Sequence, residues 1–206
     1  FMERGGPTTQ SGIHYQNSIT ALYMGDLVDP SDIPRKRKVV AVRVEAPESV
    51  DDTVVTYDDG HKLYLQAKEN IQQNEAAWED LWKDLRKQFD GSSFQKDTDR
   101  LCITFGSSRD EYHLLEDICN RAIGAVDIAE FHRRLTDKQT NILGRIETIL
   151  FASDSSRKAP AEETDLSASE PQASDKEKKK KGRKKVAHVA WDDERKYLLE
   201  LFRHIS

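Results

Sequence analysis

The fold is decided by residues 51–68, which read DDTVVTYDDGHKLYLQAK. Two stretches rich in β-branched, aromatic and leucine residues flank an Asp-Asp-Gly turn, and this pattern predicts a tight β-hairpin. Side chains two apart on a strand point to the same face, so Gln66 and Lys68 are expected side by side at the end of the second strand. The alternate residues are expected to face a core: Leu63, Leu65 and Ala67.

The first strand of the hairpin opens with two carboxylates, Asp51 and Asp52, which the turn brings to the same sheet end as Gln66 and Lys68. A carboxylate and an amide oxygen are hard ligands that suit Mg²⁺, and a neighbouring lysine can orient water and offset charge on a phosphate. Strand alternation allows only one of the two acids to face such a metal, and we favour Asp52 because it adjoins the apolar strand. The alternative is a surface hairpin whose charges serve solubility.

The composition describes one domain with a polar appendage. The chain has 206 residues, of which 36% are hydrophobic and 33% charged, and its net charge of −5 neither indicates nor excludes a nucleic-acid partner. Cys102 and Cys119 lack metal-ligand spacing and form no disulfide framework, which favours a reducing cytoplasm. The sequence has no membrane-length apolar run and no signal-peptide pattern, so no membrane partner is expected.

The remaining elements follow from periodicity and turn signals. The helix expected over 74–89 carries one apolar face, formed by Trp78, Leu81, Trp82, Leu85 and Phe89, with Asn74 as its cap. Asp127 and Asp137 are expected to cap later helices, and Cys119 to be a core residue. Lys and Arg crowd positions 35–38, either as a solvated loop or as a phosphate-contacting patch. The other expected elements are a helix within 8–29, strands at 39–44 and 101–105, the latter buried on both faces, and helices at 110–123, 128–135 and 138–152.

The carboxyl-terminal quarter changes in composition. Residues 153–187 are expected to form a disordered, lysine-rich linker, which acts either as a solvated tether or as a contact for nucleic acid. Residues 188–206 are expected to be helical again. That helix either begins a following sensor or ATPase domain or docks back on the body, which spans residues 5–152.

The element order and the motifs together resemble the PD-(D/E)XK phosphodiesterase superfamily. Its restriction-endonuclease-like core is α-β-β-β-α-β, with additional helices here at the carboxyl terminus, and the fold class implied is α/β. Asp52 and the run Gln66-Ala67-Lys68 match the acid and the E/Q-x-K of that superfamily, in which Gln replaces Glu in Mrr-like branches. A closer similarity covers roughly residues 5–150 and runs through GIHYQ at 12–16, Glu45, DDTVV at 51–55 and YLQAK at 64–68.

This closer similarity is to the double-stranded-DNA nuclease domains of bacterial antiphage effectors, which occur in CD-NTase-associated CBASS effectors, in STAND-type defence ATPases and beside HerA-like helicases. It implies that Asp52 is the principal metal ligand, that Gln66 completes the metal site and that Lys68 positions the attacking water. Glu45 would be a second acidic ligand, and Gln16 would approach the site from the first helix. The implied cofactor is Mg²⁺ or Mn²⁺.

The resemblance implies a metal-dependent endonuclease that cleaves double-stranded DNA with low sequence specificity. It would act in the bacterial cytoplasm as an antiphage effector, switched on by oligomerisation or by a partner ATPase or sensor module. The alternative is a non-catalytic interaction domain of the same fold that binds a protein or nucleic acid. In that case some apolar helix faces would partly serve assembly, whereas they otherwise form ordinary core: Leu114, Leu115 and Ile118, and Ile142, Ile146 and Ile149.

Overall fold

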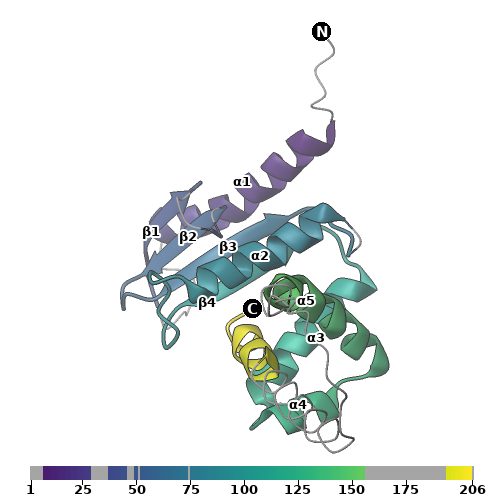
Figure 1. The fold of residues 1–206 in the computed structure, drawn as a ribbon. Helices are drawn as coiled ribbons and strands as arrows, with labels where there is room; N and C mark the ends of the chain where they lie inside the picture. The colour runs from purple at the N-terminus through teal and green to yellow at the C-terminus, as the bar shows by residue number, and fades with distance from the viewer. Residues whose placement is uncertain are drawn as a thin grey trace, which may run out of the picture.

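The computed structural model of this chain describes residues 7–28, 37–45, 49–50, 52–73, 75–155 and 194–205 (Figure 1). Several sequence predictions therefore fall outside the described residues: Asp51, the Asn74 cap, positions 35–36 of the basic cluster and nearly all of the 153–187 linker.

The chain forms a mixed α/β fold in the expected order of elements. The first six are α1 (Pro7–Val28), β1 (Val39–Val44), β2 (Thr53–Tyr57), β3 (Lys62–Lys68), α2 (Ala76–Asp90) and β4 (Arg100–Phe105). Three further helices follow, α3 (Asp110–Gly124), α4 (Ile128–Arg134) and α5 (Asp137–Ser155), and another helix spans 194–203. The sheet order is β1-β2-β3-β4, antiparallel except for the parallel β3–β4 pair that the α2 crossover connects.

Helices cover both faces of the hairpin β2–β3 (Figure 1). On one face, Thr53 hydrogen-bonds to Thr20 of α1, and the opposite residue on β3 is Leu65, which is fully buried. On the other face, Tyr64 is equally buried and belongs to the core cluster that includes α2. The alternation correctly predicted that Leu65 and Ala67 are buried, whereas Leu63 is only half-buried. The alternation did not predict the core on the opposite face. That face of β3 alternates Tyr64 with lysine and glutamine, a pattern typical of a solvent-facing surface.

The apolar face of α2 is confirmed, since its tryptophans, leucines and phenylalanine at the expected positions are all buried. The expectation that β4 is buried on both faces is wrong. Leu101 is buried, but Cys102 to Phe105 are only partly covered. β4 is an edge strand, and α1 packs mainly against β1 and β3.

Of the two caps predicted for the later helices, the structure confirms one. Asp127 caps α4, since its carboxylate accepts a hydrogen bond from the Glu130 N–H at 2.8 Å. Asp137 does not cap α5 but is its first residue. Thr136 takes that place: its hydroxyl accepts from the Gln139 N–H at 3.4 Å, and its own N–H donates to Gln139 Oε1 at 2.8 Å. This reciprocal pair is a capping box, which satisfies two backbone donors at once.

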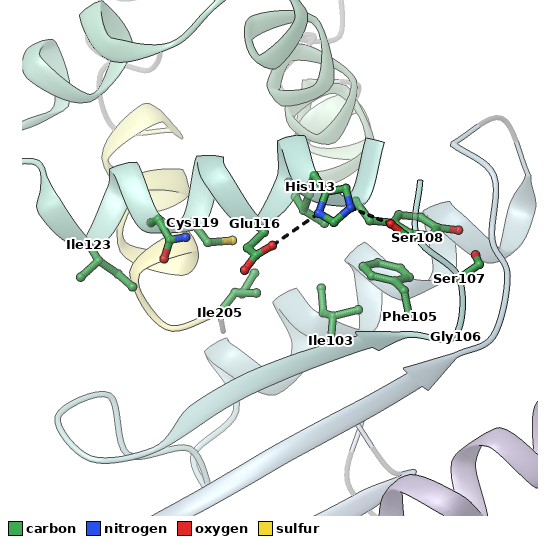
Figure 2. Close-up of a pocket in the computed structure, with 13 residues that line it drawn as sticks. Ile103, Phe105, Gly106, Ser107, Ser108, His113, Glu116, Cys119, Ile123 and Ile205 are labelled. Atoms are coloured by element: carbon green, nitrogen blue, oxygen red, sulfur yellow. Dashed lines mark hydrogen bonds and ion pairs between the residues drawn. The ribbon is translucent and has the colours of Figure 1, made fainter. Parts of the chain in front are cut away.

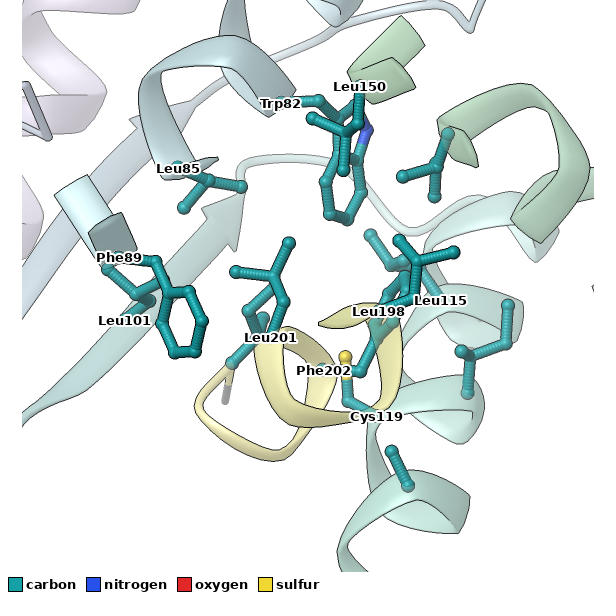
Figure 3. Close-up of a cluster of buried hydrophobic side chains, with 14 of the residues drawn as sticks. Trp82, Leu85, Phe89, Leu101, Leu115, Cys119, Leu150, Leu198, Leu201 and Phe202 are labelled. Carbon is teal, nitrogen blue, oxygen red and sulfur yellow. The ribbon is translucent and has the colours of Figure 1, made fainter. Parts of the chain in front are cut away.

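The carboxyl-terminal helix docks back on the body. Leu198, Leu201 and Phe202 lie in the core beside α2, α3 and α5 (Figure 3). Immediately after the helix, His204 O accepts from the Leu101 N–H at 2.8 Å. The structure thus shows this helix docked on the body, and the expectation of a following sensor or ATPase domain stays a prediction.

The apolar faces of α3 and α5 also pack inward. Leu115, Ile118, Ile142 and Ile146 are buried in the same core, with Leu114 and Ile149 packed against it. Cys119 is likewise a core residue, as expected. These faces serve core packing.

Candidate functional site

The sequence-predicted residues meet at one end of the sheet. β2 runs antiparallel to β1 and β3, and β4 runs parallel to β3. The start of β2 therefore lies beside the ends of the other three strands. Asp52 directly precedes β2, and Glu45 directly follows β1. Lys68 is the last residue of β3, and Gly106 directly follows β4.

Asp52 is fixed by two donors from β3. Its Oδ2 atom accepts hydrogen bonds from Gln66 Nε2 at 2.6 Å and from the Ala67 N–H at 2.7 Å. This contact follows from register, since Thr53 pairs with Leu65 and the preceding residue must then face Gln66. Bonds to an ionised carboxylate are among the strongest in proteins, so the Asp52 side chain is held in one orientation.

The orientation of Gln66 is set by chemistry. An ionised carboxylate only accepts hydrogen bonds, so the amide nitrogen of Gln66 must face Asp52 and its oxygen is turned away. Gln66 is only 5% exposed. Lys68 lies two residues further along the same face and is partly buried, next to Phe105 of β4. The expected side-by-side placement of Gln66 and Lys68 is thus what the structure shows.

Helix α1 places three polar side chains along this end of the hairpin. Ser11 donates to Glu69, Gln16 Nε2 donates to the main-chain oxygen of Asp52 at 3.3 Å, and the Thr20 hydroxyl lies 2.7 Å from that of Thr53. Gln16 therefore reaches the expected site, but it contacts the backbone that carries the acid. That contact makes Gln16 a positioning residue in this structure.

Glu45 also approaches Asp52 through its backbone. Its N–H donates to the Asp52 main-chain oxygen at 3.3 Å, and its φ of 47° is left-handed, which is uncommon for a residue other than glycine. The Glu45 side chain itself is exposed. The ligand role expected of its carboxylate stays a prediction.

Three residues of this end were not singled out from the sequence. Glu69 follows Lys68 directly and accepts from α1. Gly106 is packed so closely that an added Cβ would lie 3.0 Å from the Glu69 Cα. Gln88, which is 3% exposed on α2, accepts from the N–H groups of Ser49 and Val50 at 3.1 and 3.4 Å and so fixes the turn before Asp52. For Gln88, a signal was present in the sequence, because this glutamine lies among the apolar positions of α2.

The donor set limits which metal the site suits. Among the described residues, no group of three or more His, Cys, Asp or Glu side chains lies close enough to hold an ion. One carboxylate with an amide oxygen fits Mg²⁺, which keeps several waters and shares its remaining positions with substrate phosphates. It does not fit zinc, which takes nitrogen and sulfur ligands in a closed tetrahedron. The residue types present, an aspartate and a glutamine, therefore fit the expected magnesium ion, for which the Gln66 amide would have to turn its oxygen toward the site.

The basic cluster at 35–38 lies elsewhere as far as it is described. Arg37 forms an ion pair with Asp59 at 2.8 Å and contacts His61 Nε2 at 3.2 Å. Both partners belong to the hairpin turn, at the opposite end of the sheet from Asp52. Arg37 therefore does not line the candidate site.

Comparison with protein-family models, with curated proteins and with solved structures finds no match to this chain. In the described part of the chain, none of the helices combines the length and apolar character needed to cross a membrane.

Proposed function

We propose that this chain is a magnesium-dependent endonuclease that hydrolyses double-stranded DNA with little sequence preference. The observation that carries the proposal is the convergence of the Asp52 carboxylate, the Gln66 amide and Lys68 on one face at the end of a mixed sheet. DNA as substrate, the role as a bacterial antiphage effector and activation by oligomerisation or a sensor partner rest on the sequence resemblance.

Each residue has a distinct task in this proposal. Asp52 would hold Mg²⁺, which when bound supplies an activated water and offsets charge on the phosphate. Gln66 would add its amide oxygen after a rotation of the amide, because its nitrogen now faces Asp52 Oδ2 at 2.6 Å. Lys68 would orient the attacking water and counter the charge that develops on the scissile phosphate. Gln16 and Gln88 hold the backbone on either side of the Asp52 carboxylate, so that the carboxylate stays in place.

Metal binding is the first test, because cleavage can depend on an activator. Mn²⁺ is titrated by calorimetry into the full chain with duplex DNA present, using wild type and Asp52→Asn. The asparagine retains an oxygen for the Ala67 N–H but loses the charge, so folding should survive while metal affinity falls about a hundredfold or more. The matched control is Asp97→Asn, an exposed acid in the turn before β4. Equal Mn²⁺ binding by all three proteins would contradict the proposal.

Cleavage is the second test. Supercoiled plasmid is incubated with Mg²⁺ or with EDTA, and Lys68→Met is compared with Lys62→Met at the other end of β3. Methionine preserves the length of the side chain and removes its charge. Loss of about a hundredfold in rate is expected for Lys68→Met only. EDTA-insensitive cutting, or equal rates for the two variants, would exclude this mechanism.

One observation favours the non-catalytic alternative. Helix α1 exposes several large apolar residues, including Ile13 (51%), Leu22 (67%) and Val28 (84%). Such a surface is typical of a contact with another protein. The two functions are separated by the Mn²⁺ titration, because an interaction domain has no need of an Asp52-dependent metal site.

A further inference from the structure

A pocket of about 580 Å³ lies between the end of β4 and helix α3 (Figure 2). We call it the β4–α3 pocket. Its walls are mainly apolar and are formed by Ile103, Phe105, Leu115, Ile123 and Ile205. Its volume is in the range of ordinary ligand sites. The pocket is separate from the Asp52 carboxylate and has no task in the proposed hydrolysis.

Among the described residues, the pocket runs along an edge of β4 that pairs with another segment only at Leu101. The Gly106 N–H points toward β3, where it bonds to Lys68 O at 3.0 Å, whereas the Leu101 N–H points away from β3 and bonds to His204 O at 2.8 Å. Backbone groups alternate in direction along a strand. The N–H and C=O groups of Ile103 and Phe105 therefore point outward with those of Leu101. Within the described residues, neither Ile103 nor Phe105 has a hydrogen-bond partner for these outward groups.

The chain itself begins to fill this edge. Ile205 pairs with Leu101 in parallel, and its side chain is 3% exposed and lines the pocket. A strand continued in this direction would place its next same-face residues opposite Ile103 and Phe105. Because side chains of paired residues share a face, those residues would enter the pocket.

We propose that the β4–α3 pocket binds an extended peptide segment of a protein partner, which adds to β4 as a short parallel strand in line with Ile205. A backbone is the ligand that matches the alternating donors and acceptors of Ile103 and Phe105. A small apolar molecule would contact the apolar walls of the pocket but would leave the outward N–H and C=O groups of Ile103 and Phe105 without a partner. The parallel direction is set by the Leu101–Ile205 pair.

The residues that line the pocket also indicate which side chains the peptide should carry. Phe105 stacks on Tyr112 with ring centroids 3.8 Å apart, which gives the pocket a rigid aromatic wall. Its rim is polar: Ser108 Oγ lies 2.8 Å from His113 Nε2, and His113 Nδ1 lies 3.8 Å from Glu116 Oε2 (Figure 2). The peptide should therefore carry apolar residues at alternate positions, with polar residues between them.

The test uses a displayed library of random peptides, selected against the full chain. Ile123→Arg places a charge at the mouth of the pocket, and because Ile123 is 59% exposed the variant should fold. Selected peptides are expected to lose about tenfold or more in affinity for Ile123→Arg. Val126→Arg, at an 85% exposed residue that does not line the pocket, is the control and should bind normally.

A second readout addresses the backbone directly. Amide hydrogen exchange at Ile103 and Phe105 should slow by about tenfold or more when a selected peptide is bound. A peptide N-methylated on the residues whose N–H groups face β4 should not bind, whereas N-methylation of the alternate residues should be tolerated.

Three outcomes would overturn the proposal. One is a selection that yields no peptide sensitive to Ile123→Arg, and another is binding that leaves both amides exchanging freely. The third is a dimer of the chain alone, seen by sedimentation, in which both amides are already protected. That result would assign the pocket to a second copy of the chain.

Discussion

Gln66 and Asp52 face each other across the β2–β3 pair, with the Gln66 amide nitrogen 2.6 Å from Asp52 Oδ2. A neutral amide at this position neutralises no charge, but it donates a hydrogen bond to the carboxylate in the absence of a metal ion. Asp52 is therefore held in one orientation by donors of the protein itself, as the proposed role of a magnesium ligand would require.

Gln66→Glu should make the stability of the folded chain sensitive to a divalent cation. The substitution removes the donor and sets two carboxylates against each other in a largely buried place, which should lower the free energy of unfolding by about 1–3 kcal/mol at neutral pH. Mn²⁺ should restore most of that loss. So should acid, since protonation of one of the two carboxyls ends their repulsion and stability should rise as pH falls. Urea unfolding with and without Mn²⁺ at each pH measures both effects.

The matched control is Gln72→Glu, which makes the same change at an exposed residue beyond the end of β3. Its stability should change by less than about 0.5 kcal/mol and should not respond to Mn²⁺. If Gln66→Glu were as stable as wild type in EDTA, the Asp52–Gln66 contact would have no part in holding the site.

The Thr20–Thr53 pair ties α1 to the start of β2, and its two hydroxyls are buried 2.7 Å apart. Either single change to valine leaves one hydroxyl without its partner and should cost about 1–3 kcal/mol. The double variant removes both polar groups and should cost clearly less than the sum of the two. Urea unfolding of the four proteins gives this coupling energy, and strictly additive costs would show that the two hydroxyls do not interact.

Gly106 and Gly144 form a matched pair for testing close packing. An added Cβ at Gly106 would lie 3.0 Å from Glu69 Cα and 3.2 Å from Glu69 O, so Gly106→Ala must displace backbone beside Lys68. It should cost about 1–3 kcal/mol. Gly144 lies within α5 with open space around it, and Gly144→Ala should stabilise by up to about 1 kcal/mol. Thermal unfolding of both variants distinguishes the two, and a neutral Gly106→Ala would refute the close contact.

The contacts made by the hairpin were predictable because they follow from register. An Asp-Gly turn fixes which residues of β2 and β3 face each other, and with them the meeting of Asp52 and Gln66. The apolar face of α2 was predictable from local sequence as well, because its tryptophans and leucines recur with the helical period of 3.6 residues.

Contacts between distant segments were not predictable in this way. Gln16 and Gln88 reach the Asp52 region from two different helices, and nothing in their local sequence indicates where those helices pack. The open edge of β4 was missed because an apolar strand reads as buried even when its neighbour covers one side only. Leu101 at its start is buried because the distant segment around Ile205 returns to it.

The buried thiol of Cys119 gives a prediction about pH. Burial raises the pKa of Cys119 from its ordinary value of 9.0 to about 12, so the folded protein keeps the proton where the unfolded chain releases it. This contribution to stability is complete below pH 9.0 and falls as pH rises toward about 12. In a Cys102→Ser background, Cys119 should resist iodoacetamide at about pH 8 and react on unfolding in urea. Between about pH 8 and about pH 10, wild type should lose more stability than Cys119→Ala. Rapid alkylation of the folded protein would contradict the burial on which both expectations depend.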